Sequence, residues 1–158
     1  MGKVTGKGKF TNTNGDVFEG DLIDNKANGF GMYWYSNGCT YEGLWKDDKF
    51  HGTGKETKQD GSMIYASYWD GLKHGDCRCE FADGSVFVGR FIDDDIYGRG
   101  KLVYKDCREY EGDFINGLMH GKGVYSWKDG RKYKGEYVND KKEGYGEFVF
   151  VDGKVYKG

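Results

Sequence analysis

Residues 110–132, with the sequence YEGDFINGLMHGKGVYSWKDGRK, are repeated along the chain with a period of 23 residues. Residues 41–63 read YEGLWKDDKFHGTGKETKQDGSM, and residues 133–155 read YKGEYVNDKKEGYGEFVFVDGKV, in the same register and without an insertion. A fixed period of this length indicates a repeat architecture, in which each unit packs mainly against its neighbours.

The register divides the 158 residues into one array. We predict a partial repeat at 3–17, full repeats at 18–40, 41–63, 64–86, 87–109, 110–132 and 133–155, and a truncated repeat at 156–158. Nearly all glycines fall in a few fixed columns of this repeat, so they are predicted to be structural and not to form a flexible linker. A single domain, 1–158, is expected.

Alternation within the repeat predicts strands. Tyr41, Gly43 and Trp45 fall on one face and Glu42 and Leu44 on the other, which is the period of two expected for a strand. The second half of the repeat alternates in the same way. Asp-Gly pairs such as Asp60-Gly61 between alternating runs predict two-residue type I′ turns, and residues 46–51 are expected to form the longer loop. The fold class predicted is all-β, an elongated single antiparallel sheet of about 14 strands.

The composition supports an ordered fold. Aromatic residues make up 17% of the chain, which argues against disorder, and no proline interrupts the strands. No apolar run is long enough to span a membrane as a helix, and the start of the chain lacks the apolar core of a secretory signal. A cytoplasmic protein is therefore expected, with Cys39, Cys77, Cys79 and Cys107 reduced.

Large aromatic residues recur in columns beside the glycine columns. A glycine leaves room for a ring to lie flat on the neighbouring strand, as in the aromatic rescue of strand glycines. The core is therefore predicted to be a thin strip of rings along one face of the sheet.

These columns resemble those of the MORN repeat (membrane occupation and recognition nexus). The segment from Tyr110 to Phe114, YEGDF, together with His120-Gly121 and Gly123, matches that pattern nearly in full. The third full repeat departs from it, with Ile64, Ala66, Tyr68 and Cys77 at signature columns, and the sixth has Glu143 in place of the histidine. The resemblance implies a twisted antiparallel sheet of tandem hairpins with a groove along one face, and a role in scaffolding and protein binding at the cytoskeleton, in cilia or at membranes.

The function predicted is a non-catalytic interaction module that binds a peptide or helix of a partner protein in an aromatic groove. The groove residues predicted are Phe18, Tyr41, Trp45, Tyr68, Phe87, Phe91, Tyr110, Phe114, Tyr125, Trp127, Tyr133 and Tyr137.

The alternative is a peripheral membrane module that binds phosphoinositides. Residues 121–158 carry a small basic excess, and lysines near a membrane surface attract anionic lipid. The lipid-phosphate contacts predicted are Lys128, Arg131, Lys132, Lys134, Lys141 and Lys142.

Catalytic and metal sites are not predicted. His51, His74 and His120 occupy one column, about two strands or more apart, which is too far for them to share a metal ion, so local hydrogen bonds are expected. No Gly-x-Gly pair extends into a dinucleotide-binding motif. We therefore expect no enzyme activity, cofactor, metal or nucleic-acid partner.

The last expectation concerns the ends of the array. The edge strands of an uncapped sheet leave backbone donors and acceptors free. We therefore predict that at least one edge is covered, by a helix of a longer parent chain, by a partner or by a second copy in a homodimer, with residues 155–158 as the expected site.

Overall fold

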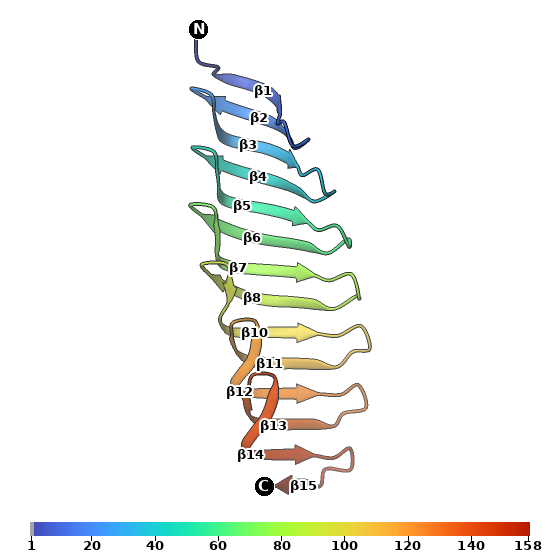
Figure 1. Cartoon of the computed structure of the whole chain (residues 1–158). Coiled ribbons are helices and arrows are strands. Elements are labelled where there is room, and N and C mark those ends of the chain that lie inside the picture. Colours follow the sequence, from blue (N-terminus) through green and yellow to red (C-terminus); the bar gives the residue numbers. More distant parts are fainter. Residues whose placement is uncertain (1) are drawn as a thin grey trace. The chain divides into compact units, whose positions relative to one another are not determined.

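The computed structural model describes residues 2–158, and every regular element in this range is a β-strand (Figure 1). No helix in this range is long and apolar enough to cross a membrane. The chain divides into two compact units, of which the first ends at Gly75 and the second begins at Asp76.

The first unit is an antiparallel meander, in which each strand pairs with the next one in the sequence. Its strands are β1 (Gly6–Thr11), β2 (Val17–Ile23), β3 (Lys26–Trp34), β4 (Thr40–Lys46), β5 (Lys49–Thr57) and β6 (Met63–Trp69). The next strand, β7 (Leu72–Glu80), runs across the division between the units.

The second unit repeats this antiparallel pattern. Its strands are β8 (Val86–Ile92), β9 (Asp95–Ile96), β10 (Gly98–Val103), β11 (Glu109–Ile115), β12 (Leu118–Ser126), β13 (Lys132–Val138), β14 (Lys141–Val149) and β15 (Val155–Lys157). The strand order of the sheet follows the sequence except that β9 pairs only with β8. The predicted antiparallel meander is thus confirmed.

The strand number differs by one from the prediction. The second strand of the 87–109 repeat is divided at Tyr97 into β9 and β10, which gives 15 strands among the described residues. The Tyr97 N–H donates a hydrogen bond of 3.1 Å to the Arg90 carbonyl, next to Gly98, which has φ +87°.

The two kinds of turn lie at the opposite ends of the repeat from those predicted. The two-residue turns with positive φ at both positions are at sites such as Asp47-Asp48, with φ of 47° and 68°, where a longer loop was expected. The Asp-Gly connections instead have three residues: the Gly61 N–H bonds to the Lys58 carbonyl at 3.0 Å and only Gly61 has positive φ. This is a type I turn followed by a left-handed residue, the usual three-residue hairpin loop.

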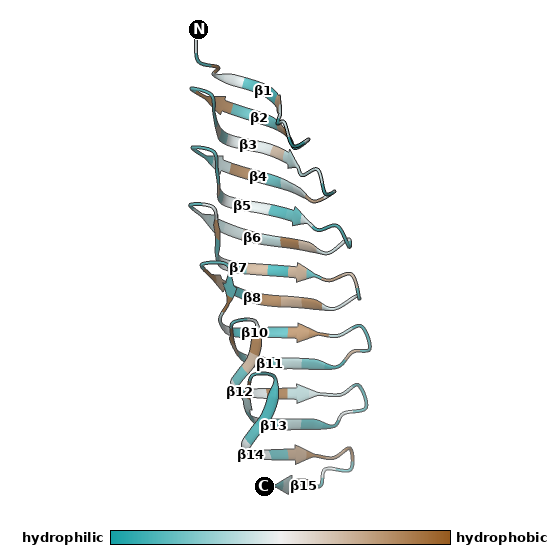
Figure 2. Cartoon of the chain, viewed as in Figure 1, coloured by the Kyte–Doolittle hydropathy of each residue, from teal (hydrophilic) through white to brown (hydrophobic). Residues whose placement is uncertain are grey.

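The turn aspartates also join successive repeats. The Asp48 N–H donates to the Ala27 carbonyl at 3.0 Å, and the Ala27 N–H donates to Asp48 Oδ1 at 2.7 Å. Asp140 and Met119 make the same pair of bonds in the second unit. Figure 2 shows that the connections between strands are mainly hydrophilic, and for Asp48 and Asp140 this polarity has a structural cause.

The core of each unit is a strip of rings on one face, called the ring face below. Tyr41 is fully buried, stacked on Phe50 at 3.7 Å between ring centroids and edge-on to Trp45 at 5.3 Å. In the second unit, Tyr110 is fully buried and edge-on to Phe114 at 5.2 Å and to Tyr137 at 5.1 Å. The predicted packing of rings against glycine columns is present, because the Tyr41 ring occupies the space that a side chain on Gly54 would need.

Candidate functional site

Most of the predicted groove residues belong to this core. Phe18, Tyr41, Trp45, Tyr68, Phe87, Phe91, Tyr110, Phe114, Tyr133 and Tyr137 are all less than 10% exposed. Their hydroxyl and indole groups are partly engaged as well: the Tyr41 hydroxyl donates to the Leu44 carbonyl at 2.7 Å, and Trp45 Nε1 donates to the Gly31 carbonyl at 3.1 Å. These rings therefore hold the fold and offer little surface to a partner, which corrects the expectation that they line an open groove.

Tyr125 and Trp127 are the two predicted groove residues that remain partly exposed. They continue into further partly exposed or exposed rings that the sequence reasoning did not select. We call the set the aromatic ladder, and it consists of Tyr104, Tyr125, Trp127, Phe148 and Phe150. Successive centroids lie 6.3, 4.7, 5.6 and 4.8 Å apart, so the five rings are in continuous contact across the second unit.

The repeat explains the position of the ladder. Tyr125 and Phe148 lie on β12 and β14, two residues before Trp127 and Phe150 respectively, and alternation places all four on the ring face. Each pair stands just before an Asp-Gly loop, where no further strand residue follows to cover it. The ladder is thus the part of the ring face that lies next to the Asp-Gly loops.

Cationic side chains lie on the ladder. The Arg108 guanidinium is 4.7 Å from the Tyr104 centroid and donates to the Tyr125 hydroxyl at 3.0 Å. Arg131 is 5.1 Å from the Trp127 centroid, and Lys142 Nζ is 5.4 Å from it. Such distances are those of cation–π contacts.

Two of these cations are also paired with loop aspartates. Arg108 Nε lies 2.7 Å from Asp106 Oδ2, and Arg131 Nε lies 2.8 Å from Asp129 Oδ2. The hydrogen bond to Asp106 raises the pKa of the Arg108 guanidinium, and burial raises the pKa of Tyr104. The border of the ladder therefore consists of two Arg–Asp ion pairs and the positive charge of Lys142.

The six basic residues predicted to contact lipid do not share one face. Lys132 and Lys134 alternate with the buried Tyr133, so they lie on the face opposite the rings, whereas Lys142 lies over Trp127 on the ring face. Lys128 and Arg131 belong to the Asp-Gly loop, and Arg131 is paired with Asp129. Lys141 follows the turn at the other end of the hairpin.

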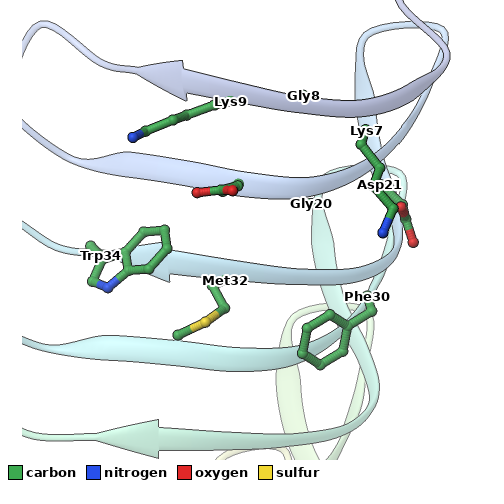
Figure 3. Close-up of a pocket in the computed structure, with 9 residues that line it drawn as sticks. Lys7, Gly8, Lys9, Gly20, Asp21, Phe30, Met32 and Trp34 are labelled. Atoms are coloured by element: carbon green, nitrogen blue, oxygen red, sulfur yellow. The ribbon is translucent and has the colours of Figure 1, made fainter.

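A second surface lies on the opposite, outer face of the first unit. Phe30, Met32 and Trp34 follow one another along β3 at every second residue, and Phe30 is 50% exposed. Figure 3 shows them in a row along β3, with Lys7 and Lys9 on the strand beyond Gly20 and Asp21. They form one wall of a depression of 580 Å³, which Lys7, Gly8, Lys9, Glu19, Gly20 and Asp21 complete. We call these three β3 residues the outer stripe.

The sequence reasoning missed the outer stripe, although a signal for it exists. Each of the other full repeats places at least one charged residue in the three corresponding columns, for example Lys55 between Thr53 and Thr57. Only residues 30, 32 and 34 make all three columns apolar. The signal lies in the columns that are polar in the other repeats, and not in the aromatic columns from which the groove was predicted.

The histidines and cysteines form no metal centre in the part of the chain that the structure describes. His51 Nδ1 accepts the Asp70 N–H at 3.4 Å, a local bond of the kind predicted, whereas His120 Nδ1 is buried without a hydrogen-bond partner. Cys77 and Cys79 are both buried as free thiols, and their hydrogen bond and burial raise the pKa of Cys77.

Among solved structures, this chain is similar to two domains that were solved in complexes with peptides. The first is the TCP domain of Drosophila melanogaster SAS-4 bound to a proline-rich motif of Ana2, with 14% identity, a TM-score of 0.57, and coverage of 96% of this chain and 88% of that one. The second is the TCP10 domain of Danio rerio CPAP bound to a STIL peptide, with 16% identity, a TM-score of 0.49, and coverage of 95% and 81%. The likeness to the SAS-4 domain shows that the two chains have a similar fold. Among curated protein sequences, none matches this chain.

The sequence profile of the MORN repeat matches six segments, at residues 1–17, 18–40, 41–63, 66–86, 110–130 and 133–155. They coincide with the predicted 23-residue register, except that residues 87–109, which contain the divided strand, are not matched. The matches cover most of the chain, and the strands, glycine columns and ring strip have the same register. This chain therefore belongs to the MORN repeat family.

Proposed function

We propose that this chain is a non-catalytic binding module whose aromatic ladder takes an extended segment of a partner protein. The observation that carries the proposal is the continuous row of five rings from Tyr104 to Phe150, all of them partly or largely accessible. Tyrosine and tryptophan offer large contact areas and lose little conformational entropy on binding, which is why they are enriched at binding sites.

The segment that suits such a surface is a proline-rich one. Proline-rich segments adopt the polyproline II helix without internal hydrogen bonds, and they dock in grooves lined by aromatic residues. The SAS-4 domain, which has a similar fold, is described in complex with a proline-rich motif. Arg108 and Arg131 are paired with Asp106 and Asp129, so an acidic residue in the segment would be attracted mainly by Lys142, which lies over Trp127.

Other aspects of the sequence analysis stay predictions. Association with the cytoskeleton, with cilia or with membranes is one of them. The phosphoinositide alternative is not proposed, because its six basic residues are spread over both faces of the second unit. A homodimer formed through residues 155–158 also stays a prediction.

Calorimetry with synthetic peptides tests the proposal. The probes are peptides of about ten residues with proline at every third position, with and without glutamates, and a matched series in which alanine replaces proline. We expect the acidic proline-rich peptide to bind best. We expect Trp127→Ala to lower the affinity of the chain for this peptide by about tenfold or more.

Trp69→Ala is the matched control, because Trp69 is 66% exposed and belongs to the first unit, whereas the ladder belongs to the second. Equal melting temperatures of the variants would establish that the fold is intact. Equal affinities of the wild type and Trp127→Ala, or equal binding of the proline-free series, would contradict the proposal.

A further inference from the structure

The outer stripe makes three successive columns of β3 apolar, and Leu44 of β4 pairs in register with Phe30 beside it. In the second unit, the corresponding face carries cross-strand ion pairs, such as Lys101 with Glu109 at 3.4 Å and Arg99 with Asp113 at 3.8 Å. A solvated sheet face normally has polar residues in such positions. Formation of the sheet therefore does not require apolar residues at all three of these positions on β3.

The charges nearest the stripe are carboxylates on both sides. Met32 pairs in register with Glu19 of β2 and with Glu42 of β4. Asp21 also lies beside the stripe, with Oδ2 3.2 Å from the position of a Cβ on Gly29. Lys7 and Lys9 lie one strand further away, in register with Asp21 and Glu19. On the other side, Lys55 of β5 lies in register with Glu42. An apolar ligand that covers the stripe therefore meets the three carboxylates first, and lysines one strand beyond them.

The dimensions suit a helix. The strands on either side of β3 lie about 9.6 Å apart, which is close to the 10–12 Å diameter of an α-helix. The stripe spans four residue steps, or about 13.6 Å, which corresponds to about nine residues of a helix. A helix lying along β3 would cover Phe30, Met32 and Trp34 with one apolar face and bring its two flanks over the carboxylates.

We propose that the outer stripe is a docking surface for an amphipathic helix of a partner protein whose apolar face is bordered by lysine or arginine. Phe30 and Trp34 supply apolar contact area, and Glu19, Asp21 and Glu42 attract the basic borders. This surface lies entirely within the first unit, and the proposal does not depend on the aromatic ladder of the second.

Fluorescence anisotropy with a labelled model helix tests this proposal. The probe is a peptide of about 14 residues with leucines at helical spacing bordered by lysines, and the comparison peptide has glutamates in place of the lysines. We expect the wild-type chain to bind the basic peptide, and to bind the acidic peptide at least about tenfold more weakly. Equal binding of the two peptides would overturn the charge assignment.

Phe30→Thr is the informative variant, because Thr53 stands in the same column of the next repeat and the substitution changes no charge. Tyr145→Thr is the matched control, since Tyr145 occupies that column in the last full repeat and is 58% exposed. We expect Phe30→Thr to lower the affinity by about tenfold and Tyr145→Thr to leave it unchanged. Equal affinities of the Phe30→Thr variant and the wild type would overturn the proposal.

Two other occupants have distinct signatures. Self-association of the wild-type chain in sedimentation equilibrium that Phe30→Thr abolishes would overturn the helix in favour of a second copy. The wild-type chain could also bind vesicles of neutral lipid and not the basic peptide. If Phe30→Thr abolished that vesicle binding, the helix proposal would be overturned in favour of a membrane surface.

Discussion

The Tyr41 ring lies against Gly54 so closely that a Cβ atom on Gly54 would be 2.5 Å from both its Cε2 and its hydroxyl oxygen. Gly54 is itself paired in register with Gly43, where a Cβ would be 2.5 Å from Gly54 Cα. The Tyr41 ring, and not only the backbone conformation, therefore excludes a side chain at Gly54.

Replacement of Gly54 by alanine should destabilise the protein by about 1–3 kcal/mol, because the added methyl group displaces a fully buried ring. In combination with Tyr41→Leu, the same replacement should cost less, since the clash is removed. Urea unfolding of the two single variants and the double variant measures this coupling. Strictly additive effects would show that the ring is not what excludes a side chain.

Cys107 has φ +72° at the loop position where the other Asp-Gly loops have glycine. A residue with a Cβ is strained in this conformation, so Cys107→Gly should stabilise the protein by about 1 kcal/mol in urea unfolding. Cys39→Gly is the control, because Cys39 does not have positive φ and its replacement should bring no gain. A stability gain that Cys107→Ala reproduces would assign the effect to the thiol and not to the backbone.

The bonds between Asp48 and Ala27 connect the hairpin turn of one repeat with the previous repeat. Asp48→Ala loses the acceptor of the Ala27 N–H and keeps a residue with φ +68°, so we expect a destabilisation of about 1–2 kcal/mol in thermal unfolding. Asp48→Asn should retain most of the stability, because Asn25 makes the corresponding bond to the Val4 N–H at 2.6 Å. Equal losses for the two variants would mean that charge matters more than the hydrogen bond.

Asp16 is buried, and it accepts hydrogen bonds from the Ser36 N–H at 2.7 Å and the Tyr33 hydroxyl at 2.8 Å. These bonds hold the pKa of Asp16 below its usual value. A carboxylate with a lowered folded-state pKa contributes stability above its unfolded pKa of about 3.9, and this contribution is lost as the pH falls through the folded-state pKa.

Wild-type protein should therefore be more stable than Asp16→Asn at neutral pH, and the difference should shrink below about pH 4. Denaturant unfolding at several pH values measures it. A difference between the two proteins that is independent of pH would contradict the role given to the charged carboxylate.

The period of the sequence was sufficient to predict the strands and the identity of the core face, because alternation and glycine columns both depend on local geometry. The turns could not be assigned in the same way. Asp47-Asp48 contains no glycine, and its left-handed conformation is stabilised by bonds to Ala27 in the preceding repeat, which no local pattern reveals.

The candidate site was predicted only in part. Tyr125 and Trp127 were identified, but the rings around Tyr41 were assigned to a groove, since alternation gives the face of a residue and not its exposure. Tyr104 and Phe150 share the column of Trp127, and Phe148 shares that of Tyr125, so the repeat does mark them. They were missed because Lys58, Glu56 and Cys79 occupy these columns in other repeats.

The four tryptophans of the chain allow one measurement to test the central claim, that the aromatic ladder receives the peptide. Trp127 lies on the ladder, Trp34 on the outer stripe, Trp45 in the core, and Trp69 is exposed. In a ¹⁵N–¹H correlation spectrum of the chain, titration with the acidic proline-rich peptide should shift the Trp127 indole N–H most and leave the other three nearly unchanged. A largest shift at Trp34 or Trp69, with Trp127 unaffected at saturation, would contradict the account.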